Sequence, residues 1–150
     1  MATDDKGVLR RSDQIRVDAT AGEVWAVLTD IPSWPTWMPD VKSAEVDGPF
    51  APGMRFRWKS GPGVIRSEVV EAEPDRSAVW RGRTLGIEAV HSWRLEDRGA
   101  GSTIVQTHES WAGLLPRVLP GYLGRTLTAT LSGALAALKA EVERRAGRPS

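Results

Sequence analysis

The fold is decided by residues 117–145, RVLPGYLGRTLTATLSGALAALKAEVERR. Large apolar side chains recur here at steps of four, four, four, three and four, which is the spacing of one face of an α-helix. The pattern predicts a long amphipathic helix over about residues 117–145. Glycines, alanines and threonines make the apolar face unsuited to a heptad seam, so we expect the helix to lie across a sheet. The apolar face consists of Leu123, Leu127, Leu131, Leu135, Leu138 and Val142.

The chain between residues 41 and 113 reads as successive strands separated by turns rich in glycine, proline and aspartate. Turns this short join antiparallel neighbours. Alternation of apolar and polar residues defines an inner face in each strand, except that the phase of the strand beginning at Val64 leaves either Arg66 or Ser67 inside. Residues expected on the inner face are Met54, Phe56, Trp58, Ala78, Trp80, Ile87, Ala89, His91, Trp93, Leu95, Val105, Thr107, Glu109 and Trp111.

The N-terminal part predicts a strand over residues 14–19 followed by a short helix. Thr20 and Glu23 have the spacing of a capping box, and an apolar helical stripe then continues to Asp30. Three prolines in residues 32–39 forbid a long helix there. We therefore expect a short helix or turn that exposes Trp34 and Trp37, which with Met38 would border the mouth of a cavity.

Length and composition indicate one domain. The chain has 150 residues and a net charge of +1, contains no cysteine, and gathers its basic residues into no stripe. Disulfides, thiolate chemistry and nucleic-acid binding are therefore excluded. No apolar run approaches the roughly 20 residues that span a bilayer, and the first residues are unlike a signal peptide. We expect a flexible segment over residues 1–12, a domain over 13–146, a tail over 147–150, a cytoplasmic location, no cofactor, and a monomer or homodimer.

Seven tryptophans against two phenylalanines and one tyrosine are an unusual choice of aromatic residues. Large inward side chains on the strands would face the small Thr126, Thr130, Ala134 and Ala137 of the helix. This mismatch in size predicts a cavity between sheet and helix, walled by Trp58, Trp80 and Trp93 and by Leu127 and Leu131. The alternative is that the tryptophans simply fill the core.

Few polar residues fall on the inner face, and two of them can meet. If the last hairpin pairs residues whose numbers sum to 198 or 200, His91 lies opposite Thr107 or Glu109. A His–Glu pair in an apolar cavity can have pKa values near neutrality and remove a proton beside a carbonyl. The alternative is a structural pair without chemistry. A metal site of His91, His108 and Glu109 is excluded because His108 and Glu109 are adjacent on a strand and point to opposite faces.

The chain resembles the SRPBCC superfamily, in particular its polyketide cyclase/dehydrase-like branch, over about residues 13–145. The superfamily also includes START lipid-transfer domains and the birch-pollen allergen. The resemblance is carried by four stretches. These are AGEVW at 21–25 with WPTWMP at 34–39, EAEP at 71–74, HSWRLE at 91–96, and GST at 101–103 leading to HESWAG at 108–113.

The resemblance implies an α+β helix-grip fold, in which a curved seven-stranded antiparallel sheet wraps around the long C-terminal helix and encloses an elongated apolar cavity. Two short helices lie between the first two strands. The function expected first is binding of a polyketide-, isoprenoid- or lipid-like molecule in that cavity. The alternatives are a cyclase/dehydratase-type enzyme with His91 and Glu109 as general acid and base, and a co-chaperone-like interaction module. Expected ligand contacts are Trp34, Trp37, Met38, Met54, Phe56, Trp58, Trp80, Trp93, Thr107, Trp111, Leu127 and Leu131.

Overall fold

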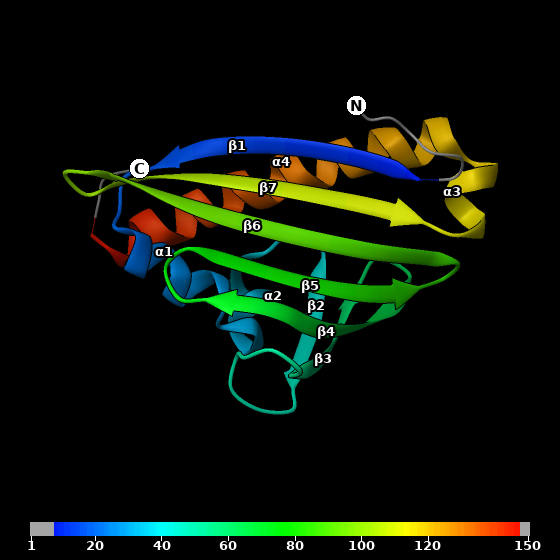
Figure 1. Cartoon of the computed structure of the whole chain (residues 1–150), viewed down its shortest axis with the longest axis horizontal. Coiled ribbons are helices and arrows are strands. Elements are labelled where there is room, and N and C mark those ends of the chain that lie inside the picture. The colour runs from blue at the N-terminus through cyan, green and yellow to red at the C-terminus, as the bar shows by residue number, and fades with distance from the viewer. Residues whose placement is uncertain (1–7, 148–150) are drawn as a thin grey trace.

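A computed structural model describes residues 8–147 and shows one antiparallel sheet against one long helix (Figure 1). No helix in this part of the chain is long and apolar enough to cross a membrane. The strands are β1 (Leu9–Val17), β2 (Val41–Val46), β3 (Arg55–Ser60), β4 (Gly63–Glu73), β5 (Ser77–Thr84), β6 (Ile87–Gly99) and β7 (Ser102–Ala112). The helices are α1 (Ala21–Leu28), the 3-10 helix η1 (Ile31–Ser33), α2 (Trp34–Trp37), α3 (Leu114–Val118) and α4 (Pro120–Arg145).

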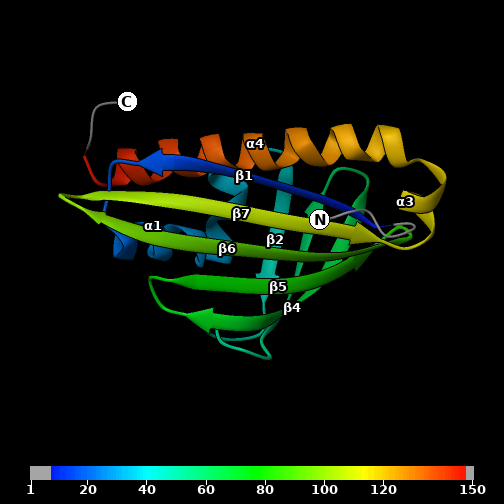
Figure 2. The ribbon, with the colours of Figure 1, turned by 45° about the horizontal axis from the view of Figure 1, so that its top comes forward.

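The strand order is β1-β7-β6-β5-β4-β3-β2, so every hairpin from β2 to β7 joins neighbours and only β1 crosses to the far edge. Register shifts interrupt the ladders in β2, in β4 and near the end of β6. Such irregularities bend a strand and increase its twist. In Figure 2, α4 runs along β1 and β7, while β4 and β5 lie farther from it. The sheet and helix expected of a helix-grip fold are confirmed.

The long helix begins later than its apolar pattern indicated. Residues 117–145 were expected to form one helix, but Leu119 separates α3 from α4 with φ −125° and ψ 52°. Leu119 precedes Pro120, and the proline ring disfavours helical geometry in the residue before it. The break lets α3 turn back across the end of the sheet.

The N-terminal helix α1 agrees with the expectation from the sequence, whereas the strand before it begins earlier than expected. Thr20 and Glu23 form the expected capping box of α1, with the Glu23 amide donating to Thr20 Oγ1 at 3.1 Å. β1, however, begins at Leu9 and pairs with β7 from Leu9–Trp111 onward, so residues 9–12 are strand rather than the expected flexible segment. Leu9 is the one apolar residue among these four, so no alternation of apolar and polar residues marks the strand in the sequence. Residues 1–7 and 148–150 of the expected termini lie outside the described residues.

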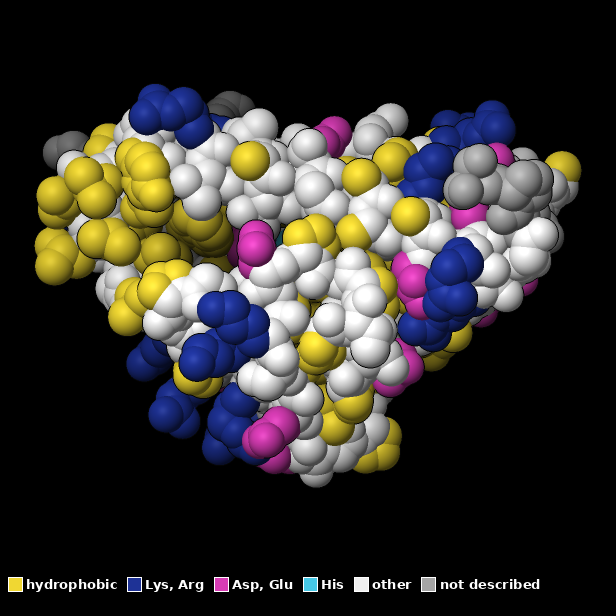
Figure 3. Space-filling model, turned by 180° about the vertical axis from the view of Figure 1, so that it is seen from behind, with side chains coloured by type: hydrophobic (Ala, Val, Ile, Leu, Met, Phe, Trp, Pro, Cys, Tyr) yellow, Lys and Arg dark blue, Asp and Glu magenta, His cyan; other side chains and the backbone are white. Residues whose placement is uncertain are grey.

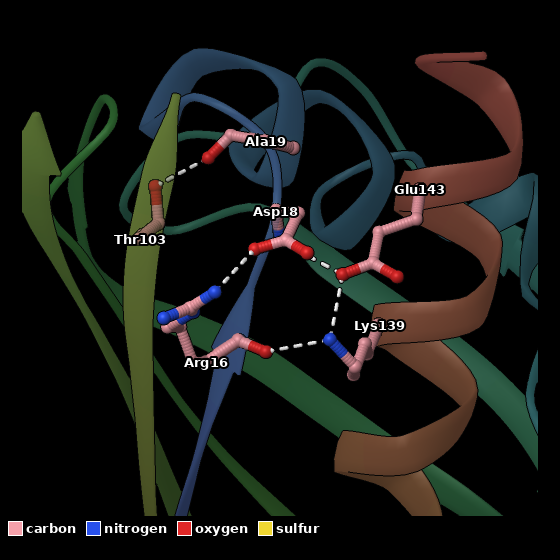
Figure 4. Close-up of polar contacts among 6 residues, drawn as sticks. All are labelled: Arg16, Asp18, Ala19, Thr103, Lys139 and Glu143. Atoms are coloured by element: carbon pink, nitrogen blue, oxygen red, sulfur yellow. Dashed lines mark hydrogen bonds and ion pairs between the residues drawn. The ribbon is translucent and has the colours of Figure 1, made fainter. Parts of the chain in front are cut away.

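A polar clasp fixes the C-terminal half of α4 to the end of β1 (Figure 4). The buried Glu143 carboxylate accepts from the Asp18 amide at 2.8 Å and from Lys139 Nζ at 2.7 Å. Lys139 also donates to the Arg16 carbonyl at 2.9 Å. These bonds satisfy backbone groups that the β1–α1 connection would otherwise leave unpaired. They hold α4 across the sheet at one end only.

The buried apolar residues form two clusters. The larger joins α1, α2, the C-terminal half of α4 and the inner faces of most strands. The smaller consists of Leu9, Leu123, Leu127 and Leu131, with Trp111 and Leu115 packed against it. The N-terminal half of α4 therefore contributes to the smaller cluster and the C-terminal half to the larger one.

Candidate functional site

The inner face of the sheet has the phase that the alternation predicted. His91, Trp93, Val105, Thr107 and Glu109 are all buried. The open question about β4 is settled in favour of Ser67, which is buried and whose hydroxyl accepts from Trp58 Nε1 at 3.1 Å, while Arg66 is exposed. His108 lies on the outer face, where its Nδ1 is 2.7 Å from Ser12 Oγ. The outward direction of His108 agrees with the argument against a metal site.

Two neighbouring strands bring the predicted acid–base pair together. His91 of β6 is directly opposite Glu109 of β7, a pairing whose residue numbers sum to 200. His91 Nδ1 lies 3.5 Å from Glu109 Oε1. His91 Nε2 lies 2.7 Å from Thr107 Oγ1, and Trp111 Nε1 donates to Glu109 Oε2 at 3.0 Å. Four inner side chains thus form one connected polar group in an apolar surrounding.

The hydrogen bonds assign the protons of this group. Thr107 Oγ1 donates its only hydrogen to the Ser92 carbonyl at 3.2 Å. The same oxygen must therefore accept from His91, which places the imidazole hydrogen on Nε2. His91 Nδ1 then presents a lone pair to Glu109 Oε1. That contact is favourable only when one proton lies between the two groups, on either the imidazole or the carboxyl.

Burial shifts both pKa values in the direction that keeps the pair uncharged. It raises the pKa of Glu109 from 4.5 to about 7, against smaller opposing effects of the Trp111 hydrogen bond and of His108. Burial also lowers the pKa of His91 from 6.5 to about 3, with His108 adding to the decrease. Near neutral pH the imidazole is therefore neutral, and the carboxyl holds its proton to a higher pH than an exposed glutamate does. Such a carboxyl can both give and accept a proton.

Thr107→Val is expected to lower the free energy of unfolding by about 1–3 kcal/mol, because it leaves the buried His91 Nε2 hydrogen without an acceptor. Thr107→Ser keeps the hydroxyl and should recover most of that loss. Urea denaturation of both variants measures the difference. Equal stability of the valine and serine variants would contradict the proton assignment.

The tryptophans expected to wall a cavity mostly contact one another. The ring centroid of Trp80 lies 5.9 Å from that of Phe56, 6.4 Å from that of Trp93 and 5.5 Å from that of Trp34. Trp80, Trp93 and the half-buried Trp58 all belong to the larger cluster. Leu127 and Leu131 belong to the smaller one. The residues expected around a single cavity are therefore divided between two cores.

The proline-rich segment suggested that Trp34 borders the mouth of a cavity, and this expectation is wrong. Trp34 is fully buried, and its Nε1 donates to the Leu28 carbonyl at 3.0 Å. Its ring lies edge-on to Phe56 and to Trp58, at 5.8 and 5.3 Å. The short helices turn this indole under the sheet, a placement that local sequence does not indicate. Trp37 and Met38 are half-buried against the same core, and Met54 is buried within it.

A hollow in the surface lies at the end of the molecule where α3 packs. Figure 3 shows hydrophobic side chains gathered at this end and the surface hollowed beside them. Leu115 of α3 packs against Trp111 and the smaller cluster, and Trp111 in turn binds Glu109. The exposed residues of α3 are not among the site residues expected from the sequence. The apolar run at residues 111–116 was the signal that could have found them.

A second depression of about 600 Å³ lies on the outer face of the sheet. Its polar side chains already bind one another, as in the pairs Ser12–His108 and Gln14–Gln106. Such a polar groove does not suit an apolar ligand. The inner side of the sheet, with its buried acid–base pair, is the candidate site.

Comparison with known proteins fits this geometry. Residues 9–143 match the model of a family described as "Polyketide cyclase / dehydrase and lipid transport". The chain belongs to this family. The match covers β1 to α4 and so includes both clusters and the buried pair. No curated protein matches significantly.

Solved structures of low sequence identity share the fold of this chain. A START superfamily protein from Mycobacterium smegmatis aligns with a TM-score of 0.77 at 20% identity, over 90% of this chain and 97% of the other. The ZhuI aromatase/cyclase from Streptomyces sp. R1128 aligns with a TM-score of 0.78 at 18% identity, over 95% and 99%. At such identities the likeness shows the fold, and the function of this family member must come from its own residues.

Proposed function

We propose that this family member binds an apolar small molecule of the polyketide, isoprenoid or lipid type inside the fold, between the sheet and α4. The observation that carries the proposal is the buried His91–Glu109 pair on the inner face. Placing an ionisable pair in an apolar interior is costly, and pairs of this kind are concentrated at functional sites. The hollow beside α3 supplies a route from the surface toward Trp111 and Glu109.

Unpartnered hydrogen-bond donors indicate that the ligand carries oxygen. The indole Nε1 atoms of Trp37 and Trp93 are buried and have no hydrogen-bond partner among the described residues. Trp93 is on the inner face, and its ring centroid lies 4.9 Å from that of His91. A ligand carbonyl would give the Trp93 donor an acceptor next to the acid–base pair. This favours an oxygenated apolar molecule over a plain hydrocarbon chain.

Binding is tested with two neutral fluorescent probes, prodan, which is a naphthalene ketone, and phenylnaphthylamine, which has no carbonyl. We expect saturable binding of prodan, with a shift of tryptophan emission. Trp93→Phe keeps an aromatic ring but loses the donor, and should weaken prodan binding about tenfold while changing phenylnaphthylamine binding little. Trp25→Phe, in α1, is the matched control.

Native mass spectrometry of the protein purified gently from its host then identifies the retained molecule. A bound mass that is released on denaturation and displaces prodan would support the proposal. Neither retained mass nor saturable binding of either probe would contradict it.

A second candidate function, cyclisation or dehydration of a poly-carbonyl chain, is favoured by the pKa of Glu109 near 7. As a carboxylate, Glu109 can take a proton from a carbon beside a carbonyl, so that this carbon attacks a second carbonyl of the same chain. As an acid, it can return this proton to the alkoxide that the attack forms. In a second cycle it can take a further proton from the carbon beside the carbonyl and give it to the new hydroxyl, which leaves as water. The neutral His91 would hold Glu109 in place through the contact of its Nδ1 with Glu109 Oε1. An apolar interior that excludes water suits both steps.

A further inference from the structure

Six of the eight large hydrophobic side chains exposed in the described part of the chain lie at one end of the molecule. Leu114 and Val118 of α3 are 71% and 63% exposed, and Leu85 and Tyr122 are each 60% exposed. Clusters of this kind on a soluble domain mark interaction surfaces. We call this set the apolar tip, and it consists of Val64, Leu85, Leu114, Val118, Leu119 and Tyr122.

Contacts between three segments make the tip continuous. The Leu115 amide donates to the Gly86 carbonyl at 3.3 Å, which joins α3 to the β5–β6 turn. The side chains of Thr84 and Leu85 lie against Gly63, with Thr84 Oγ1 2.9 Å and Leu85 Cδ1 3.0 Å from the position of a Cβ there, which joins this turn to the start of β4 and Val64. Leu114 and Val118 are four residues apart and share a face of α3. The gathering of hydrophobic side chains in Figure 3 marks the same end.

The β5–β6 turn carries a leucine where its backbone favours another residue. Leu85 and Gly86 both have positive φ, 44° and 78°, and join the paired residues Thr84 and Ile87. Such two-residue turns favour asparagine or glycine, because a side chain strains the left-handed backbone. A leucine that is both strained and exposed has no role in the folded core. The position of Leu85 on the apolar tip indicates a role in binding at that surface.

The charges around the tip are almost all positive. From residue 110 to residue 130 the sequence contains two cations, Arg117 and Arg125, and no aspartate or glutamate. Lys59 and Arg83 are exposed on the adjoining hairpins, where Glu88 is the one acidic neighbour, opposite Arg83. An apolar centre with a basic border complements a surface that is apolar beneath anionic groups.

We propose that the apolar tip docks onto the surface of a bilayer that contains anionic lipid. Leu85, Leu114 and Val118 would enter the boundary between headgroups and acyl chains, and Tyr122 would lie at that boundary with its hydroxyl in water. Arg117 and Arg125 would remain among the anionic headgroups, where each basic side chain strengthens binding about fivefold. The hollow beside α3 would then open toward the membrane. This docking goes beyond the proposed ligand binding and does not require it.

Vesicle co-sedimentation tests the proposal without any internal ligand. We expect the protein to bind vesicles of phosphatidylcholine with phosphatidylglycerol, to bind phosphatidylcholine vesicles at least tenfold more weakly, and to be released from the mixed vesicles by high salt. Leu114→Gln/Val118→Gln should lower binding to the mixed vesicles tenfold or more. Arg117→Gln/Arg125→Gln should lower it similarly and remove most of the salt dependence.

Val70→Gln is the matched control. Val70 is 46% exposed, on β4 beside the residue that pairs with Gly53, away from α3. This substitution should leave vesicle binding unchanged, and all variants should keep the melting temperature of the parent. Absence of vesicle binding by the parent, or equal binding by the tip variants, would overturn the proposal. So would a tip variant that changes only the oligomeric state on gel filtration, because the tip would then be an interface between copies. Binding of the fluorescent probes in the interior can succeed with each of these outcomes, so failure of the membrane proposal is distinguishable from failure of the proposed function.

Discussion

Glu109→Gln is expected to gain about 3 kcal/mol of stability relative to the parent protein as the pH rises from about 4.5 to about 7. Over this range the folded parent keeps a proton on Glu109 that the unfolded chain releases, because burial raises the pKa of Glu109 from 4.5 to about 7. The contribution of Glu109 to stability is therefore complete below pH 4.5 and is lost as the pH rises through 7. Glutamine does not titrate and loses nothing.

His91 has the opposite dependence. Its pKa falls from 6.5 to about 3 on folding, so its contribution is complete above pH 6.5 and is lost as the pH falls through 3. Between pH 4.5 and 6.5 the loss of the Glu109 contribution and the gain of the His91 contribution with rising pH cancel. The reason is that the pair binds one proton in the folded state and one in the unfolded state. The parent should show nearly constant stability over this interval, whereas Glu109→Gln should become steadily more stable as the pH rises.

Urea denaturation at pH 4.5, 5.5, 6.5 and 8, spanning the pKa values cited, measures both curves. The exposed Glu73→Gln is the control for replacing a carboxyl by an amide at the surface. If the difference between Glu109→Gln and the parent is independent of pH, Glu109 titrates alike in both states and is not held protonated by its surroundings.

Turnover of a poly-carbonyl substrate should fall about a hundredfold or more in Glu109→Gln and in His91→Ala, if the second candidate function holds. The affinity for the same substrate should stay within a few-fold, because the apolar walls remain. The amide of the glutamine variant keeps the shape of the carboxyl and can accept from Trp111, but it cannot give or take the proton. Steady-state kinetics and binding measured on the same preparations separate the two quantities.

Thr107→Ser serves as the control for this comparison, since it keeps the hydroxyl that orients His91 without touching Glu109. It should retain most of the turnover. Activity that merely follows the folded fraction of each variant would show that the pair is structural, and would leave ligand binding as the function.

The sequence by itself determined the strands and the long helix of this family member, because both rest on local periodicity. Alternation in β6 and β7 placed His91, Thr107 and Glu109 on one face, and the short connection between these strands allowed only two registers. One of them, with His91 opposite Glu109, is the observed pairing. The leucine spacing of α4 likewise needs no knowledge of the neighbours that the helix packs against.

Only the tertiary structure decided which large side chains share a core. Trp34 was expected at a surface because its segment is rich in proline. It is instead buried against Phe56 of β3 and Trp80 of β5, which are 22 and 46 residues away in the sequence. The two halves of α4 enter separate clusters, although their leucines follow one unbroken pattern. The proton arrangement of His91 depends on a hydroxyl two residues from Glu109 and on the Ser92 carbonyl. Burial and pKa depend on distances between segments, which the packing of the whole chain sets and local periodicity does not encode.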